Sequence, residues 1–129
     1  MSIAQGEKAA RFQALHNGPT AFVLPNPWDV GSARILAGLG FQALATSSAA
    51  SASAVGRKDH ELTRDESLAH ARLIVDATDL PVSADLGKGF GDAPEVVAQR
   101  SGWRLRQGWL AARSKMRLVS QRSRFTTPA

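Results

Sequence analysis

The sequence predicts an α/β fold in which strands and helices alternate along the chain. Two patterns support this prediction. Short apolar runs of the kind that form buried strands recur about every forty residues, and each is followed by a segment with helix-capping or helical spacing signals. Such alternation implies parallel strands joined by right-handed crossovers. Three strand–helix units are only part of a closed barrel or of a doubly wound sheet.

Each predicted element follows from local signals: strands where an apolar run ends in a turn, and helices where helical spacing meets a cap or a stop. The clearest helix start is Thr63, because Glu66 three residues later completes a capping box. In chain order, the prediction is a helix over residues 3–16, a strand over 21–24, a helix over 30–39, a strand over 41–45, a small-residue loop over 46–60, a helix over 63–78, a strand over 80–84 and a helix that opens at Asp92.

The segments that directly follow the strands are the candidate functional segments, because ligand sites of parallel α/β folds lie at the carboxyl ends of the strands. Asp29 and Asp92 are expected to be helix caps rather than catalysts. The Ser/Ala-rich loop over residues 46–60 is either a flexible linker or a ligand loop, and its composition leaves both open. Asp85 is the stronger candidate, because a carboxylate after a buried strand and beside a glycine turn is costly unless it binds something.

The charge of the chain changes abruptly near its carboxyl-terminal quarter. The formal net charge is +5, but residues 1–99 carry eight Lys or Arg against eleven Asp or Glu, a net of −3. Residues 100–129 carry eight Lys or Arg and no acid, a net of +8. The chain has no cysteine, no signal-like segment and no apolar run long enough to span a membrane, so we expect a cytoplasmic protein.

Three segments in register resemble the isocitrate lyase and phosphoenolpyruvate mutase family, in the branch of carboxyvinyl-carboxyphosphonate and methylisocitrate enzymes. The segments are LPNPWDVGSARILAGLGFQALATSS, the Ser/Ala loop that ends in VGRKD, and LPVSADLGKGFGD. The resemblance covers residues 10–98 and implies the amino-terminal part of a (β/α)8 TIM-type barrel. It also implies a Mg²⁺-dependent lyase or mutase that acts on C–C or P–C bonds of small 2-keto or 2-hydroxy acids through an enolpyruvate-type intermediate.

The resemblance assigns roles to individual residues. Asp85 would be a metal-site carboxylate, and Asp59 would act in catalysis from the gating loop. Ser47, Ser48 and Ala49 would present backbone amides and a hydroxyl to a small carboxylate substrate. Intact members of the family are implied to be homo-oligomeric.

The sequence departs from the family pattern at two places. The second acid, expected two positions after Asp85, is replaced by Gly87, which removes an expected metal ligand. The glutamate of the family's Gly-Ser-Ile-Glu-Asp strand has no counterpart in the tail as written. Both departures indicate that this form of the chain is inactive.

The basic tail over residues 99–129 permits two interpretations. One is a small basic nucleic-acid-binding protein whose arginines contact RNA or DNA, although an arginine-rich apolar surface would also bind nucleic acid nonspecifically. The other is an out-of-frame segment, foreign to the barrel. When each codon's last base is joined to the next two bases, synonymous codons for residues 109–117 allow the reading V-G-G-S-I-E-D-A. The proline-free stretch 101–115 could also form a covering helix.

The gene itself tests the frame change. We expect the nucleotide sequence after codon 98 to encode, in a shifted frame, A-K-R-L-A-L-A-A-G-L-V-G-G-S-I-E-D-A-T-G-I-P-A-Q-P-I-Y-D-A followed by the remaining barrel units. Reading all frames of the gene checks this expectation. If no frame continues the barrel, the tail is not a frameshift product.

Overall fold

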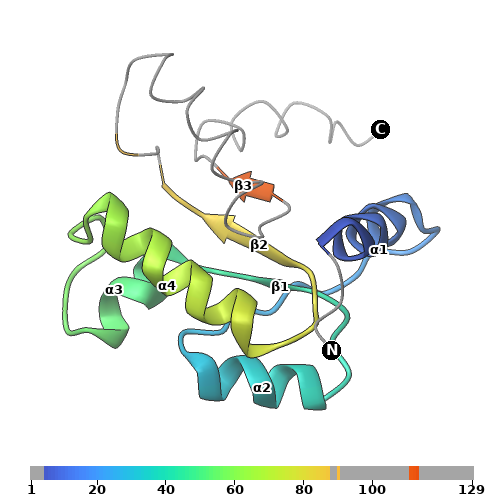
Figure 1. Ribbon diagram of the computed structural model, residues 1–129, viewed down its shortest axis with the longest axis horizontal. Helices are drawn as coiled ribbons and strands as arrows, with labels where there is room; N and C mark the ends of the chain where they lie inside the picture. Colours follow the sequence, from blue (N-terminus) through green and yellow to red (C-terminus); the bar gives the residue numbers. More distant parts are fainter. Residues whose placement is uncertain (1–4, 88–89, 91–110, 114–129) are drawn as a thin grey trace, which may run out of the picture.

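The computed structural model describes residues 5–87, 90 and 111–113 (Figure 1). Over these residues the chain contains both helices and strands, but they do not alternate strictly: two helices precede the first strand and two lie between the first and second strands. The predicted helix that opens at Asp92 lies outside the described residues. In chain order the elements are α1 Gln5–Asn17, α2 Val30–Gly38, β1 Leu44–Ala45, α3 Ser48–Ala54, α4 Arg64–Ala77, β2 Val82–Asp85 and β3 Ala111–Arg113.

The strands form one parallel sheet in the order β1-β2-β3. Leu44 of β1 is opposite Val82 of β2, and Ser83 of β2 is opposite Ala111 of β3. Helices α3 and α4 lie in the connection from β1 to β2, as expected of a crossover between neighbouring parallel strands. The prediction of parallel strands is therefore confirmed for the described residues.

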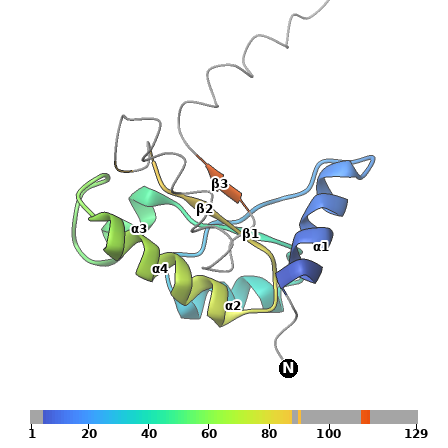
Figure 2. The same cartoon turned by 45° about the horizontal axis from the view of Figure 1, so that its top comes forward.

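Helices α2, α3 and α4 lie together along one face of the sheet, whereas α1 lies apart from them (Figures 1 and 2). The core forms where α4 meets β1 and β2, and it buries Ala71, Ile74 and Val75 of the helix. Leu44 and Val82 supply the sheet side of this core. Helix α1 is tied to the rest by Lys8, which is buried and whose Nζ donates to the Thr78 carbonyl oxygen over 3.0 Å.

The predicted capping residues begin their helices. The Asp29 carboxylate accepts from the Ser32 backbone N–H at the start of α2, so the prediction that Asp29 is a cap is confirmed. Thr63 and Glu66 form the predicted capping box of α4. The hydrogen bond from the Thr63 backbone N–H lowers the pKa of Glu66 most, and the hydrogen bond from the Arg57 guanidinium lowers it further. These helix starts are determined locally, which explains why the sequence revealed them.

Three predicted elements differ in the structure. The predicted strand over residues 41–45 is shortened to β1 Leu44–Ala45. Residues 21–24 do not form a strand. Pro25, which follows them, contacts β1, because the Ala45 N–H donates to its carbonyl oxygen over 3.0 Å. Pro25 and Pro27 have no N–H groups, so they cannot extend a ladder. The predicted loop over residues 46–60 contains α3, because alanine favours helix and the Ser47 hydroxyl caps it.

Strand β3 lies within the stretch that could have formed a covering helix. Residues 111–113 instead pair in parallel with the outer edge of β2. An uncovered strand edge presents unpaired N–H and C=O groups, which an extended segment satisfies more directly than a helix does. Among the described residues, no helix is both long enough and apolar enough to cross a membrane.

Neighbouring residues of α4 test the core. Ile74 has no solvent exposure, whereas Leu73 is 57% exposed on the same helix. We expect Ile74→Ala to lower the free energy of unfolding by about 2–5 kcal/mol, because the substitution leaves a cavity between α4 and the sheet. Leu73→Ala, the matched control, should change it by about 0.5 kcal/mol or less. Urea unfolding monitored by circular dichroism measures the free energy of unfolding of both variants. Equal losses in the two variants would show that the core does not lie between Ile74 and the sheet.

Candidate active site

The candidate site forms where β1 and β2 end, because both strands are parallel and their carboxyl ends lie side by side. Thr46, which follows β1, is buried, and its backbone N–H donates to the Ser83 carbonyl oxygen over 2.8 Å. Its hydroxyl oxygen accepts from the Asp85 backbone N–H over 2.9 Å. Thr46 therefore fixes the position of Asp85 at the end of β2.

The Asp85 carboxylate is held by backbone amides from two segments. Its Oδ1 accepts from the Gly87 N–H over 2.9 Å, and its Oδ2 accepts from the Ser48 N–H over 3.3 Å. The structure thus brings together Asp85 and Ser48, two of the residues predicted from the sequence. Backbone amides from two segments therefore fix the orientation of the carboxylate at the end of β2.

The other two predicted substrate-binding residues lie beside Ser48 at the start of α3. The Ser47 hydroxyl accepts from the Ala50 N–H over 3.3 Å and so acts as a helix cap. Ala49 is exposed in the first turn of the helix. Ser47 is positioned by its role as a cap, whereas the backbone of Ser48 faces Asp85.

Asp59, the predicted catalytic residue of the gating loop, lies beside His60. Its Oδ2 is 3.4 Å from His60 Nε2. His60 has a backbone φ of +72°, a left-handed conformation that is uncommon for residues other than glycine. The imidazole lies close to Gly87, because a Cβ atom built on Gly87 would be 3.6 Å from His60 Nδ1. His60 thus brings the turn that contains Asp59 next to the turn that follows β2.

His70 of α4 links two further segments that follow predicted strands. Its Nε2 is 2.8 Å from the Trp28 carbonyl oxygen, and its Nδ1 is 2.9 Å from the Ser51 hydroxyl of α3. The pKa of Asp29 is lowered mainly by hydrogen bonds from the Ser32 backbone N–H and hydroxyl. The proximity of His70 lowers it further. Sequence reasoning missed both His60 and His70. No local pattern marks them, since their contacts join segments far apart in the chain.

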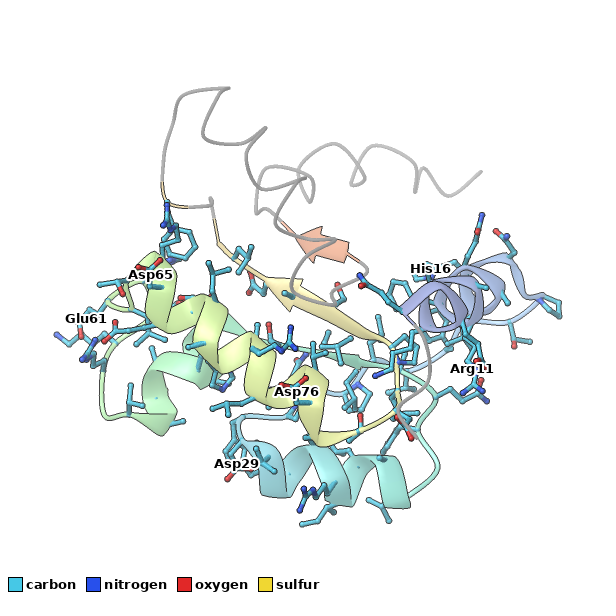
Figure 3. All side chains as sticks on the ribbon, in the orientation of Figure 1. Arg11, His16, Asp29, Glu61, Asp65 and Asp76 are labelled. Carbon is cyan, nitrogen blue, oxygen red and sulfur yellow. The ribbon has the colours of Figure 1, made fainter. Side chains whose placement is uncertain are left out.

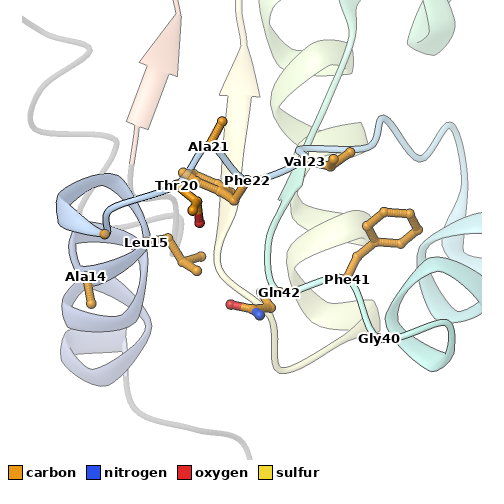
Figure 4. A pocket seen from close by; sticks show the side chains of 10 residues that line it. Ala14, Leu15, Thr20, Ala21, Phe22, Val23, Gly40, Phe41 and Gln42 are labelled. Carbon is orange, nitrogen blue, oxygen red and sulfur yellow. The ribbon is translucent and has the colours of Figure 1, made fainter.

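A cavity lies away from this site, at the amino ends of the strands (Figure 4). It has a volume of about 500 Å³ and is bounded by the end of α1, residues 20–23 and residues 40–42. Charged side chains such as Glu61, Asp65 and Arg11 lie on the outer surface of the molecule (Figure 3). Neither feature contributes to the candidate site.

The expected Mg²⁺ does not fit the residues present. Mg²⁺ requires oxygen ligands in near-ideal octahedral geometry, commonly with one or two carboxylates. Position 87 supplies no carboxylate, and the two oxygens of Asp85 already accept from amides. Among the residues that the structure describes, no three His, Asp or Glu side chains are grouped so that they could hold a metal ion.

Comparison with known proteins decides the family. The family model of phosphoenolpyruvate phosphomutase matches residues 12–105, most of the chain. This chain belongs to the phosphoenolpyruvate mutase family. The match extends past residue 98, where the sequence resemblance was expected to end, and stops before β3.

Individual relatives agree with this assignment. An uncharacterised protein of Mycobacterium tuberculosis is 38% identical over 88 residues, which are 67% of this chain and 34% of the relative. The 2,3-dimethylmalate lyase of Eubacterium barkeri is 37% identical over 91 residues, which are 69% of this chain and 32% of the enzyme. This mutase-family chain therefore spans about a third of the length of the curated relatives it matches.

Solved structures show the same relationship. The crystal structure of a protein from Burkholderia cenocepacia J2315, assigned as a lyase or mutase, is 48% identical to this chain with a TM-score of 0.81. The similarity covers 84% of this chain and 39% of that protein. The arrangement of helices and strands around the candidate site is thus similar to that of the corresponding part of this Burkholderia cenocepacia protein.

The position of Asp85 can be tested through Thr46. We expect Thr46→Val to lower the free energy of unfolding by about 1–3 kcal/mol, because the isosteric change leaves the Asp85 N–H without its acceptor. Thr46→Ser keeps the hydroxyl and is the control. Urea unfolding measures both variants, and a Val variant as stable as the Ser variant would show that the hydroxyl does not hold Asp85.

Proposed function

We propose that this chain carries the first part of the active site of a lyase or mutase on a (β/α)8 barrel. Its substrates would be small 2-keto or 2-hydroxy acids whose C–C or P–C bonds are broken through an enolpyruvate-type oxyanion. The observation that supports this proposal is the meeting of Asp85 with the Ser48 amide at the carboxyl ends of β1 and β2. In barrel enzymes this end of the sheet is the catalytic end.

The chemistry requires groups that stabilise negative charge on oxygen. In the lyase reaction, a hydroxyl-bearing carbon becomes a keto carbon as its hydroxyl loses a proton. The electron pair of the broken C–C bond passes to the neighbouring fragment as an enolate-type oxyanion. Backbone N–H groups aimed at such an oxyanion stabilise it. We assign this binding role to Ser47, Ser48 and Ala49, and we assign to Asp59 a catalytic role on the loop beside them.

Asp85 is assigned to the metal position of the family, but Gly87 leaves this position without its second acid. We therefore derive no catalytic step through Mg²⁺. In the structure the Ser47 hydroxyl accepts from the Ala50 N–H and the Ser48 N–H donates to the Asp85 carboxylate, so a substrate would have to replace these contacts. The residues described here do not supply the cation that would balance the charge of the oxyanion. This is the first reason to expect an inactive chain.

The second reason is the tail. We propose that residues 99–129 are an out-of-frame segment and that 1–98 are the barrel part proper. The change in charge at residue 100 supports this boundary. The shifted reading places its Gly-Ser-Ile across codons 111–114, where the structure has β3. An in-frame strand at this place would contribute the glutamate that follows Gly-Ser-Ile.

An activity assay tests the proposal. We expect the 129-residue chain to release neither pyruvate nor glyoxylate from 2-methylisocitrate-type substrates in the presence of Mg²⁺. A chain with the restored reading frame should fold, and its turnover should also require an acid at position 87. Coupled dehydrogenase assays measure both products, and Asp85→Asn in the restored, acid-containing chain is the control.

Two outcomes would contradict the proposal in different ways. Turnover by the 129-residue chain at rates usual for enzymes would show that this form is active. A restored, acid-containing chain that folds but releases no keto-acid from any of these substrates would argue against the lyase assignment. Formation of homo-oligomers by the restored chain alone would agree with the assembly implied for intact members.

A further inference from the structure

Two residues in the left-handed region of backbone conformation face each other at the candidate site. His60 has φ +72° and Gly87 has φ +56°. For glycine this conformation carries no steric penalty, but for an L-residue it costs about 1–2 kcal/mol. His60 is thus a strained residue on the turn beside Asp59, and such outliers often mark functional positions.

The two positions are sterically and chemically linked. A Cβ atom on Gly87 would lie 3.6 Å from Nδ1 and 3.8 Å from Cε1 of His60, which is ordinary van der Waals contact. A carboxylate at position 87 would therefore lie within reach of the imidazole.

We propose that His60 and Gly87 together convert this site from one that binds a divalent cation into one that does not. Without an acid at position 87, Asp85 is left as a single carboxylate whose oxygens accept from the amides of Ser48 and Gly87. With an acid at position 87 alone, that carboxylate would pair with the His60 imidazole and not with a cation. Both positions must change for a cation to bind. The inference depends on the proposed function only in that residues 85–87 are taken as the ligand-facing turn.

Binding of Mn²⁺ to the full 129-residue chain tests this proposal, since electron paramagnetic resonance detects free Mn²⁺ directly. The test variant is His60→Gly combined with Gly87→Asp. Aspartate is chosen because it tolerates positive φ better than most residues, and glycine at position 60 removes the backbone strain. We expect the double variant to bind Mn²⁺ at least ten-fold more tightly than the native chain, and Gly87→Asp alone to bind less than three-fold more tightly.

The control variant is His60→Gly combined with Gly87→Asn, which keeps the shape and backbone conformation of the test variant but lacks the carboxylate. It should bind Mn²⁺ no better than the native chain. Circular dichroism and thermal unfolding establish that each variant is folded. If the aspartate variant does not fold, the same comparison is made with His60→Asn in place of His60→Gly, because asparagine also tolerates positive φ and lacks the imidazole.

Three results would overturn the proposal. The first is Mn²⁺ binding by the native chain that Asp85→Asn abolishes. The second is equal Mn²⁺ affinity of the single Gly87→Asp variant and the double variant, which would show that His60 does not interfere. The third is a folded double variant that binds no more tightly than its asparagine control. Each of these is read from cation binding without turnover, so it is distinguishable from failure of the lyase proposal.

Discussion

The pairing of β1 with β2 is the constraint on which the rest of this structure depends. Leu44 lies opposite Val82, and Val82 and Ala84 face the core that α4 closes. Alternation along β2 then turns Ser83 and Asp85 the other way. A slip of one residue would place Asp85 in the apolar core. Thr46 disfavours this slip, because its backbone N–H and its hydroxyl both form hydrogen bonds with β2.

Elements held by interactions between residues close in sequence could be predicted more readily than elements that depend on distant segments. Helices α2 and α4 were predictable because Asp29 and Thr63 cap them through bonds within one turn. Residues 21–24 were wrongly predicted to be a strand from their apolar composition. A strand also needs a neighbouring strand to pair with, and apolar composition alone does not show whether one is available. Helix α3 was hidden by the small residues around Ser47, whose composition fits a linker and a short helix equally well.

The candidate site was predictable in a similar way. Asp85 stood out because its position after a buried strand is costly without a partner, and the structure supplies that partner in the Ser48 amide. His60 and His70 could not be found, since neither belongs to a local motif. Their importance depends on contacts with Gly87 and Trp28, which the crossover topology brings near.

Strand β3 shows that pairing in a parallel sheet depends only weakly on the amino-acid sequence. The contacts that place residues 111–113 beside β2 are made between backbone groups, which every residue except proline offers in full. A segment at the edge of a sheet must therefore have an extended backbone, but the identity of its side chains matters only weakly. Residues 111–113 occupy the edge of β2 that a second molecule could otherwise extend by pairing with it.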